Sequence, residues 1–502
     1  MEEKPIDKDI NGKEYNKTLL IITLLLGSFV SILNSTILST ALPHIMQYFS
    51  ITASTVQWLT TAFLLVNAIM IPLTALLIEK FSTKKLFMFS MLIFGVGTLV
   101  CAFSSSFNVL LVGRIIQAAG AGIMMPLINT VFLFIFPPEK RGFAMGLYGL
   151  VASFAPAIGP TLAGLIIDQW DWHFLFYMLI PVLILDIIFV FFFMKDVIPL
   201  KNPKIDLLSI VLSTIGFGSM LYGLSSAGNK GWSDIGVITT IIAGAAISAL
   251  FVWRQIAMEK PMLEMRVFKS NTFSLTTIIV SILNIASVGA TVIIPIFLQN
   301  VLGKSAFTSG LVLLPGALLM AAAMIVSGRL HDKYGAKKLA IPGIILLIIA
   351  TLPFTNLSKS ASVAYITVSY AIRFVGIALA IMPLQAAGVN SLPNKLLPHA
   401  TAVVNMAKQL AASLGTAVLI TAMSNIAASN APDKALASTN LALYEAGTSD
   451  AIIKGINTTF VLVSAIILVS LVLSFFLKNK QKPLTTIDDT EPGSVNHLEN
   501  KE

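Results

Sequence analysis

Long apolar runs with charges confined between them are the feature that most limits how this chain can fold. Of its 502 residues, 56% are hydrophobic and 11% are charged, whereas soluble proteins carry about 25% charge. Fourteen runs are long enough for a helix to cross a bilayer, which takes about 20 residues. Only helices and closed barrels satisfy every backbone polar group in lipid. The sequence therefore predicts an all-α polytopic membrane protein.

Most of the expected crossings are joined by short connections. The exceptions are the 427–453 loop and two polar tails, 1–17 and 478–502. We expect the fourteen crossings near 18–40, 52–78, 85–104, 107–134, 141–168, 174–194, 206–226, 235–255, 272–300, 306–328, 338–356, 361–388, 400–426 and 454–477.

The distribution of Lys and Arg indicates which side faces the cytoplasm. An even number of crossings places both chain ends on one side, and that side holds 25 of the 33 basic residues, against 5 on the other. Cytoplasmic loops carry such an excess, so we expect both tails in the cytoplasm of a protein of the cell membrane. The same bias accounts for the net charge of +9, and we expect no nucleic-acid partner.

A turn motif occurs twice, as TALLIEKFSTKKL (74–86) and SGRLHDKYGAKKL (327–339). Each copy ends one apolar run, turns with an acid and two lysines, and opens the next run. Two such copies indicate two related halves, as in many transporters. We therefore divide the chain into a tail (1–17), an N-terminal six-helix half (18–194), a linker with two inserted helices (195–260), a C-terminal six-helix half (261–477) and a second tail (478–502).

The stretch 142–164, GFAMGLYGLVASFAPAIGPTLAG, is predicted to be a bendable helix buried between others. At helical spacing most of its glycines fall on one face, which another backbone can approach closely because side-chain bulk is absent. Its two prolines each remove a backbone donor, so neighbouring helices or a cavity must satisfy the freed carbonyls. Five residues are expected to serve a change of conformation: Gly149, Pro156, Gly159, Pro160 and Gly164.

Four motifs occur in order on the expected helices. They are the repeated turn, Arg114-Ile-Ile-Gln117-Ala-Ala-Gly120, the stretch 142–164, and DWHFLFYMLIP at 171–181. In this order they resemble the motifs GxLaDrxGrkk, RxxqGxG, GPxxGG and WRWxFxxNxP of the major facilitator superfamily. Within it, the chain resembles the fourteen-helix drug:proton antiporters of the EmrB/QacA type. The resemblance covers residues 18–478 and implies two six-helix halves plus two inserted helices.

The resemblance also implies a function. It indicates a secondary active transporter that exports small amphipathic drugs or toxic compounds by proton antiport with alternating access, as in multidrug efflux and antibiotic resistance. The implied partners are the substrate, protons and the lipid bilayer, with no cofactor or metal, and we expect a functional monomer. A carrier dedicated to a physiological solute is the alternative. No nucleotide loop, metal cluster or catalytic triad occurs in the sequence, so we expect no enzyme.

Arg114 is a cation within an apolar span and needs a partner or water. In the family, the matching arginine lies near an acid of the first span and is linked to proton relay. Here that position is Asn34, which can accept a hydrogen bond but cannot take a proton. We expect Arg114 and Gln117 at the coupling site or cavity, with helix–helix bonding as the alternative. Asn34 is either a cavity contact or a polar tie between helices.

Three further ionisable residues lie within expected spans. Asp186 is the acid placed most plainly at membrane depth, where desolvation favours its neutral form. It is either a proton carrier or a structural acid at the contact with the inserted helices. Arg373 and Lys408 are either cavity or relay residues, or anchors at helix ends. Several cations facing one acid would favour neutral or anionic substrates over bulky dications.

The repeated turns have a mechanical interpretation. Asp332 is expected to cap a helix start or to pair with a basic residue across the cytoplasmic face, which would latch one conformation. The alternative is that the turns only determine topology. The predicted latch residues are Glu79, Lys84, Lys85, Gly328, Asp332, Lys333, Gly335 and Lys337.

Overall fold

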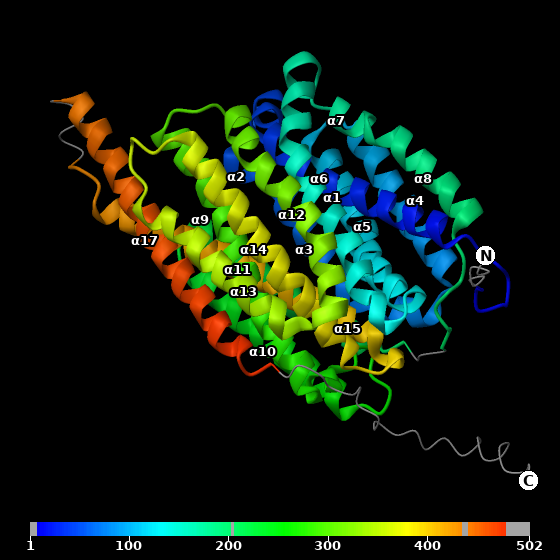
Figure 1. Ribbon diagram of the computed structural model, residues 1–502. Helices are drawn as coiled ribbons and strands as arrows, with labels where there is room; N and C mark the ends of the chain where they lie inside the picture. The colour runs from blue at the N-terminus through cyan, green and yellow to red at the C-terminus, as the bar shows by residue number, and fades with distance from the viewer. Residues whose placement is uncertain (1–7, 202–204, 434–439, 478–502) are drawn as a thin grey trace, which may run out of the picture.

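The computed structural model describes residues 8–201, 205–433 and 440–477. Within these ranges, fourteen helices are long and apolar enough to cross a membrane, which confirms the predicted number. Figure 1 shows them as long rods packed side by side in one bundle. The all-α prediction is confirmed as well.

The N-terminal half contains six long helices and two short ones. The short helices α2 and α7 directly precede α3 and α8, so two predicted spans each begin with a separate turn. The bounds are α1 (Lys17–Tyr48), α2 (Ala53–Val56), α3 (Trp58–Lys80), α4 (Thr83–Ala102), α5 (Phe107–Ile135), α6 (Arg141–Gln169), α7 (Phe174–Tyr177) and α8 (Leu179–Phe193).

The rest of the described chain adds eight long helices. The first two, α9 and α10, are the inserted pair, and α11 continues into a π-helical turn, Phe297–Val301. The bounds are α9 (Leu207–Lys230), α10 (Ile235–Ala257), α11 (Asn271–Ile296), α12 (Ala306–Tyr334), α13 (Ala336–Thr351), α14 (Val363–Asn390), α15 (Leu397–Ser429) and α17 (Leu441–Ser474).

The loop predicted at 427–453 is shorter in the structure, since α15 ends at Ser429 and α17 begins at Leu441. The last helix, α17, already begins at Leu441, where the side chain of Asn440 accepts a hydrogen bond from the backbone N–H of Leu443 (3.1 Å). Its first turns carry Glu445 and Asp450, which made the segment read as a loop. A helix that projects beyond the apolar layer has no need of an apolar sequence there. Residues 434–439 lie outside the described part.

Polar side chains fix where many of the helices begin. A helix leaves its first backbone N–H groups without partners, and a Ser or Asp directly before it can accept from one of them. This occurs at the starts of α4, α5, α10, α11, α12 and α14, where the caps are Ser82, Ser106, Asp234, Ser270, Ser305 and Ser362.

Two hydrophobic cores underlie the two halves. One is built from buried side chains between Leu20 and Ile198, and the other from side chains between Ile279 and Leu477. The inserted helix α9 packs against both α3 and α15, and a third cluster joins Ile71 of α3, Phe217 of α9 and Val403 of α15. The inserted pair therefore lies across the boundary between the halves.

Asp206 ties the two inserted helices together at the start of α9. Its Oδ2 accepts from Ser209 Oγ (2.6 Å) and from Arg254 Nε (3.0 Å) of α10. Burial raises the pKa of Asp206, but these hydrogen bonds and the charge of Arg254 outweigh burial, so its pKa lies below the usual range. The carboxylate is thus a stable anchor for the pair.

The most extensive contact between the halves is α6 against α12, and glycines make it possible. A Cβ atom on Gly146 would lie 2.7 Å from the carbonyl oxygen of Met324, and one on Gly328 would collide with the backbone of Gly142. At Gly149 a Cβ would lie 3.0 Å from the Met324 sulfur. The two backbones approach this closely because no side chain separates them.

The two repeated turns lie at the same end of the bundle, as the sequence predicts. A chain of contacts leads from Glu79, before the first turn, to Asp332, before the second, through Lys201, Lys395, Asn394, Arg141 and Gly142. Lys17 of α1 donates to the carbonyl of Ile135, and Lys337 donates to that of Phe475, so both described chain ends reach this end as well. We call it the basic face.

A single added methyl group on α6 tests the glycine contact. We expect Gly146→Ala to destabilise the protein by about 1–3 kcal/mol, because overpacking forces the backbones apart. The matched control is Gly164→Ala on the same helix, where a Cβ would meet nothing within 4 Å. That control should be neutral or gain up to about 1 kcal/mol from helix propensity. Thermal unfolding in detergent measures both, and equal unfolding temperatures would contradict the contact.

Candidate functional site

Three of the predicted residues form one buried polar network in the N-terminal half. Arg114 Nη1 donates to Gln117 Oε1 (2.9 Å), and Gln117 Nε2 donates to Thr98 Oγ1 (2.9 Å) and, at 3.4 Å, to Asn34 Oδ1. The network thus connects α5 with α4 and α1. The amide nitrogen of Asn34 is buried and has no partner among the described residues.

Arg114 itself is 1% exposed and lies against an aromatic ring. Its guanidinium carbon is 4.2 Å from the centre of the Phe63 ring, and its Nε is 3.5 Å from the carbonyl oxygen of Leu59 on α3. No carboxylate among the described residues pairs with it. Its charge is therefore held by amide and carbonyl dipoles and by the π face of Phe63.

Arg373 occupies a related position in the C-terminal half. Its Nε donates to Thr351 Oγ1 (3.2 Å) at the end of α13, and its Nη2 donates to the carbonyl oxygen of Ala286 (2.6 Å) on α11. Like Gln117, it links the fourth long helix of its half with the third and the first. Its Nη1 is buried without a partner among the described residues.

Lys408 lies on α15, where its carbonyl oxygen accepts from Asn284 Nδ2 (2.8 Å) of α11. Its side chain is partly buried and forms no ion pair within the described ranges. Lys408 lies twelve residues into a helix that begins at the basic face, so anchoring at a helix end does not describe its position. The structure does not join Lys408 to the Arg114 network.

Asp186 is fully buried on α8, and neither of its carboxyl oxygens has a hydrogen-bond partner among the described residues. It faces α1, because a Cβ on Gly27 would lie 2.7 Å from Asp186 Oδ2, and Phe87 and Met91 of α4 border the same point. The alternative that placed Asp186 at the inserted helices is therefore wrong about the location. Helix α8 packs on α1 and α4 instead.

Asp332 caps a helix of the opposite half. Its two carboxyl oxygens accept from the backbone N–H groups of Gly142 (3.0 Å) and Phe143 (3.1 Å), in the first turn of α6. The residue before α6, Lys140, supplies no side-chain cap. A carboxylate at a helix start is favoured by both the free N–H groups and the helix dipole. Gly328, one turn earlier on α12, provides the close approach that this contact requires.

Arg141 is an inter-half contact that the sequence analysis missed. It is 3% exposed, and its guanidinium donates to Asn390 Oδ1 (3.2 Å), to Asn394 Oδ1 (2.8 Å) and to the carbonyl oxygen of Leu133 (3.0 Å). Sequence reasoning counted Arg141 only as part of the charge bias. The two asparagines lie 249 and 253 residues away, and no local pattern identifies them.

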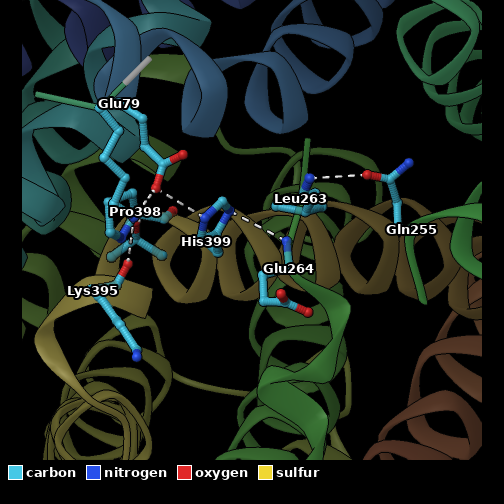
Figure 2. Close-up of polar contacts among 9 residues, drawn as sticks. Glu79, Gln255, Leu263, Glu264, Lys395, Pro398 and His399 are labelled. Atoms are coloured by element: carbon cyan, nitrogen blue, oxygen red, sulfur yellow. Dashed lines mark hydrogen bonds and ion pairs between the residues drawn. The ribbon is translucent and has the colours of Figure 1, made fainter. Parts of the chain in front are cut away.

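Glu79 makes the second acidic contact between the halves (Figure 2). Its Oε1 lies 3.2 Å from His399 Nε2 in the first turn of α15 and 2.5 Å from Lys201 Nζ. The backbone N–H of Glu264 donates to His399 Nδ1 (3.3 Å), so the ring proton belongs on Nε2, facing Glu79. Sequence reasoning missed both His399 and Lys201.

The lysines of the two turns have different contacts from those predicted. Lys84 Nζ donates to the carbonyl oxygen of Phe191 (2.5 Å), and Lys337 Nζ to that of Phe475 (2.6 Å). Each lysine therefore binds the end of the last helix of its own half, where a cation is favoured. Lys85 and Lys333 form no hydrogen bond or ion pair with the opposite half in the described part. Of the predicted latch residues, Glu79, Gly328 and Asp332 therefore contact the opposite half. Gly335 ends α12 instead, with φ of +83°.

The conformational residues of α6 do not form one surface. Gly149 packs on α12, whereas Gly159 packs on α1, where an added Cβ would collide with Thr36 Oγ1. Gly164 faces open space, so the prediction that it serves a close contact is wrong. Pro156 lies within α6, which runs unbroken from Arg141 to Gln169. The side chain of Pro160 lies outside the described part.

Two helical halves joined at one end, with polar groups buried at membrane depth, are the architecture of a membrane transporter. Comparison with known families agrees. Residues 24–416 match the model of the Major Facilitator Superfamily, and the chain belongs to this family.

Curated relatives cover nearly the whole chain. The uncharacterized MFS-type transporter YcnB of Bacillus subtilis (strain 168) is 46% identical over 95% of this chain and 98% of its own. The lincomycin resistance protein LmrB of the same strain is 40% identical over 93% of this chain and 97% of its own. The multidrug export protein EmrB of Escherichia coli (strain K12) is 29% identical over 81% and 80%.

Solved structures share the fold at low identity. The human organic anion transporter MFSD10 (TETRAN) superposes with a TM-score of 0.62 at 14% identity, covering 90% of this chain and 99% of its own. The chain is therefore a fourteen-helix member of the superfamily whose relatives include drug-resistance and multidrug export proteins.

Removing the Asp332 cap tests the contact between α6 and α12. Loss of an N-cap costs about 1 kcal/mol, or about a fivefold change in an equilibrium. The reporter is a cysteine introduced by Met145→Cys, at a side chain 5% exposed between the halves. We expect Asp332→Ala to raise severalfold the rate at which N-ethylmaleimide labels this cysteine.

The control is Asp196→Ala, which removes an acceptor from the backbone N–H of Lys84 (2.9 Å) within one half. It should leave the labelling rate unchanged. The native Cys101 is fully buried, and Asp332→Ala without the introduced cysteine measures its background. Equal rates in both aspartate variants would contradict a role of Asp332 in closing the basic face.

Proposed function

We propose that this protein exports small amphipathic compounds across the cytoplasmic membrane by proton antiport with alternating access. The observation that carries the proposal is full-length similarity to a lincomycin resistance protein, at 40% identity over 93% of the chain. The similarity to a multidrug export protein supports the same direction of transport.

The distribution of contacts between the halves supports alternating access. The polar ones gather at the basic face, where Asp332, Arg141 and Glu79 each reach the opposite half. A further contact there joins Thr130 of α5 to Thr401 of α15 through their hydroxyl groups (2.8 Å). These few bonds are spread over short segments, so the opposite state need break only a small number of them.

We assign the basic face to the cytoplasm because of the charge bias of the sequence. Both chain ends are then cytoplasmic, and the arrangement described above is a state closed toward the cytoplasm. To export a drug, such a carrier must accept the substrate in a state open toward the cytoplasm. It releases the substrate in the state described here, which is closed toward the cytoplasm. We propose that the protein acts as a monomer.

Asp186 is our candidate for the residue that takes the proton. Asn34 stands where the family resemblance implies an acid, and an amide cannot titrate. Asp186 is the acid among the described residues that combines full burial with no hydrogen-bond partner. It faces α1 at Gly27, two turns from Asn34 of the Arg114 network. A change in its protonation would therefore alter the packing of α1, the helix that carries Asn34.

Efflux measurements test the function. Cells that overproduce the protein are expected to accumulate severalfold less lincomycin than cells with Arg114→Ala, and a proton uncoupler should abolish the difference. Arg114→Ala removes the donor that holds Gln117. Equal accumulation, with both proteins present in the membrane at equal amounts, would contradict export.

Asp186→Asn tests proton coupling in proteoliposomes. The amide keeps the shape of the side chain but cannot exchange a proton, so we expect transport driven by an imposed pH gradient to fall at least tenfold. The control is Asp450→Asn, an acid whose side chain is 67% exposed. Unchanged pH-driven transport by Asp186→Asn would exclude Asp186 as the proton carrier and leave it a structural residue.

A further inference from the structure

A cavity lies between α3, α9, α11 and α15, in the part of the bundle away from the basic face. Its volume is about 360 Å³, within the range of small-molecule sites. Helix α3 contributes residues from its start, Gln57 to Leu65, and α9 contributes residues near its end, Leu221 to Ser225. Since α3 ends and α9 begins at the basic face, both places lie toward the opposite face.

The polar side chains of the lining have donors and acceptors free to bind a ligand. It consists of amide and hydroxyl groups from three helices: Gln57, Thr61, Ser225, Gln409, Ser413 and Thr416. All but Thr416 make no side-chain hydrogen bond to any described residue, and Thr416 donates only to its own helix, at Ala412 (2.9 Å). These groups can therefore both donate to and accept from a bound molecule.

The remaining lining is apolar, and the inserted helix supplies one wall of it. Leu221 and Leu224 of α9 face the cavity together with Leu65 of α3 and Ile420 of α15. Such a lining of apolar surface with a few convergent polar groups is typical of small-molecule sites.

Two contacts hold α9 in this position. The ring of Tyr222 stacks on Trp58 of α3, with centroids 5.8 Å apart and planes inclined by 23°. Just after α9, Trp232 Nε1 donates to Thr421 Oγ1 (3.0 Å) of α15. The wall is thus fastened to both halves beside the cavity.

We infer that this cavity is a substrate site in which α9 forms one wall, and that it takes an uncharged, drug-sized amphipathic compound carrying amide or hydroxyl groups. The inference rests on the proposed function and adds the site and the substrate class to it. The described lining contains none of Asn34, Thr98, Arg114 and Gln117, so the site is separate from the Arg114 network. The inserted helix α9 then contributes to specificity.

The absence of charge in the lining sets the substrate class. Among the described residues, no acidic or basic side chain lines the cavity, and a charged ligand would lose its hydration there without gaining a counter-ion. An uncharged compound loses less on entry and can use every polar group of the wall.

Chloramphenicol is a suitable probe, because it is uncharged and carries one amide and two hydroxyl groups. Its binding to the purified full-length protein in lipid nanodiscs is measured by scintillation proximity. We expect saturable binding to the unaltered protein, loss of at least tenfold in affinity for Leu224→Trp, which fills the cavity, and a three- to tenfold loss for Gln409→Leu. The matched control, Ile215→Trp, lies on the same helix at a side chain 48% exposed and should bind normally.

The outcomes are distinguishable. The site is overturned if the unaltered protein shows no saturable binding, if Leu224→Trp binds as well as Ile215→Trp, or if ethidium competes as strongly as unlabelled chloramphenicol. Efflux that depends on the proton gradient would still stand in those cases. Conversely, binding blocked by Leu224→Trp alone, without any export from cells, would support the site and contradict the proposed function.

Discussion

The close approach of α6 and α12 is the contact on which the arrangement of the two halves depends. It requires glycine at Gly146 and Gly328, because a side chain at either would meet the opposite backbone. It also brings Asp332 to the first turn of α6, so that a helix of one half receives its cap from the other. Packing and hydrogen bonding are therefore satisfied by the same geometry, and neither half completes this junction alone.

The turn motif of each half makes two corresponding contacts, one inside its own half and one with the opposite half. Five residues after each acid of the turn, Lys84 and Lys337 bind the carbonyl end of the last helix of their own half. The acids themselves diverge: Asp332 reaches backbone N–H groups, whereas Glu79 meets the side chain of His399. The two halves thus share the anchoring contact inside each half, whereas their acids contact the opposite half in different ways.

The sequence predicted the features that depend on composition and local motifs. It did not predict the features that depend on contacts between residues far apart in the chain. Hydropathy gave the fourteen spans, since lipid leaves the backbone few alternatives, and the motif of α5 pointed to Arg114, Gln117 and Asn34, which the structure joins. Arg141 and His399 were missed because their partners are distant in sequence, and nothing local marks them. Gly164 was misplaced because helical spacing gives a face but does not say which neighbour covers it.

The position of α9 has a consequence for how such a carrier moves. This helix is fastened to α3 through Tyr222 and to α15 through Trp232, so it cannot travel rigidly with both halves. In the alternating access that we propose, movement of one half relative to the other must break or shift one of these two contacts. An insertion without contacts to both halves would not be strained by such a movement, whereas the two contacts of the α9 region oppose it.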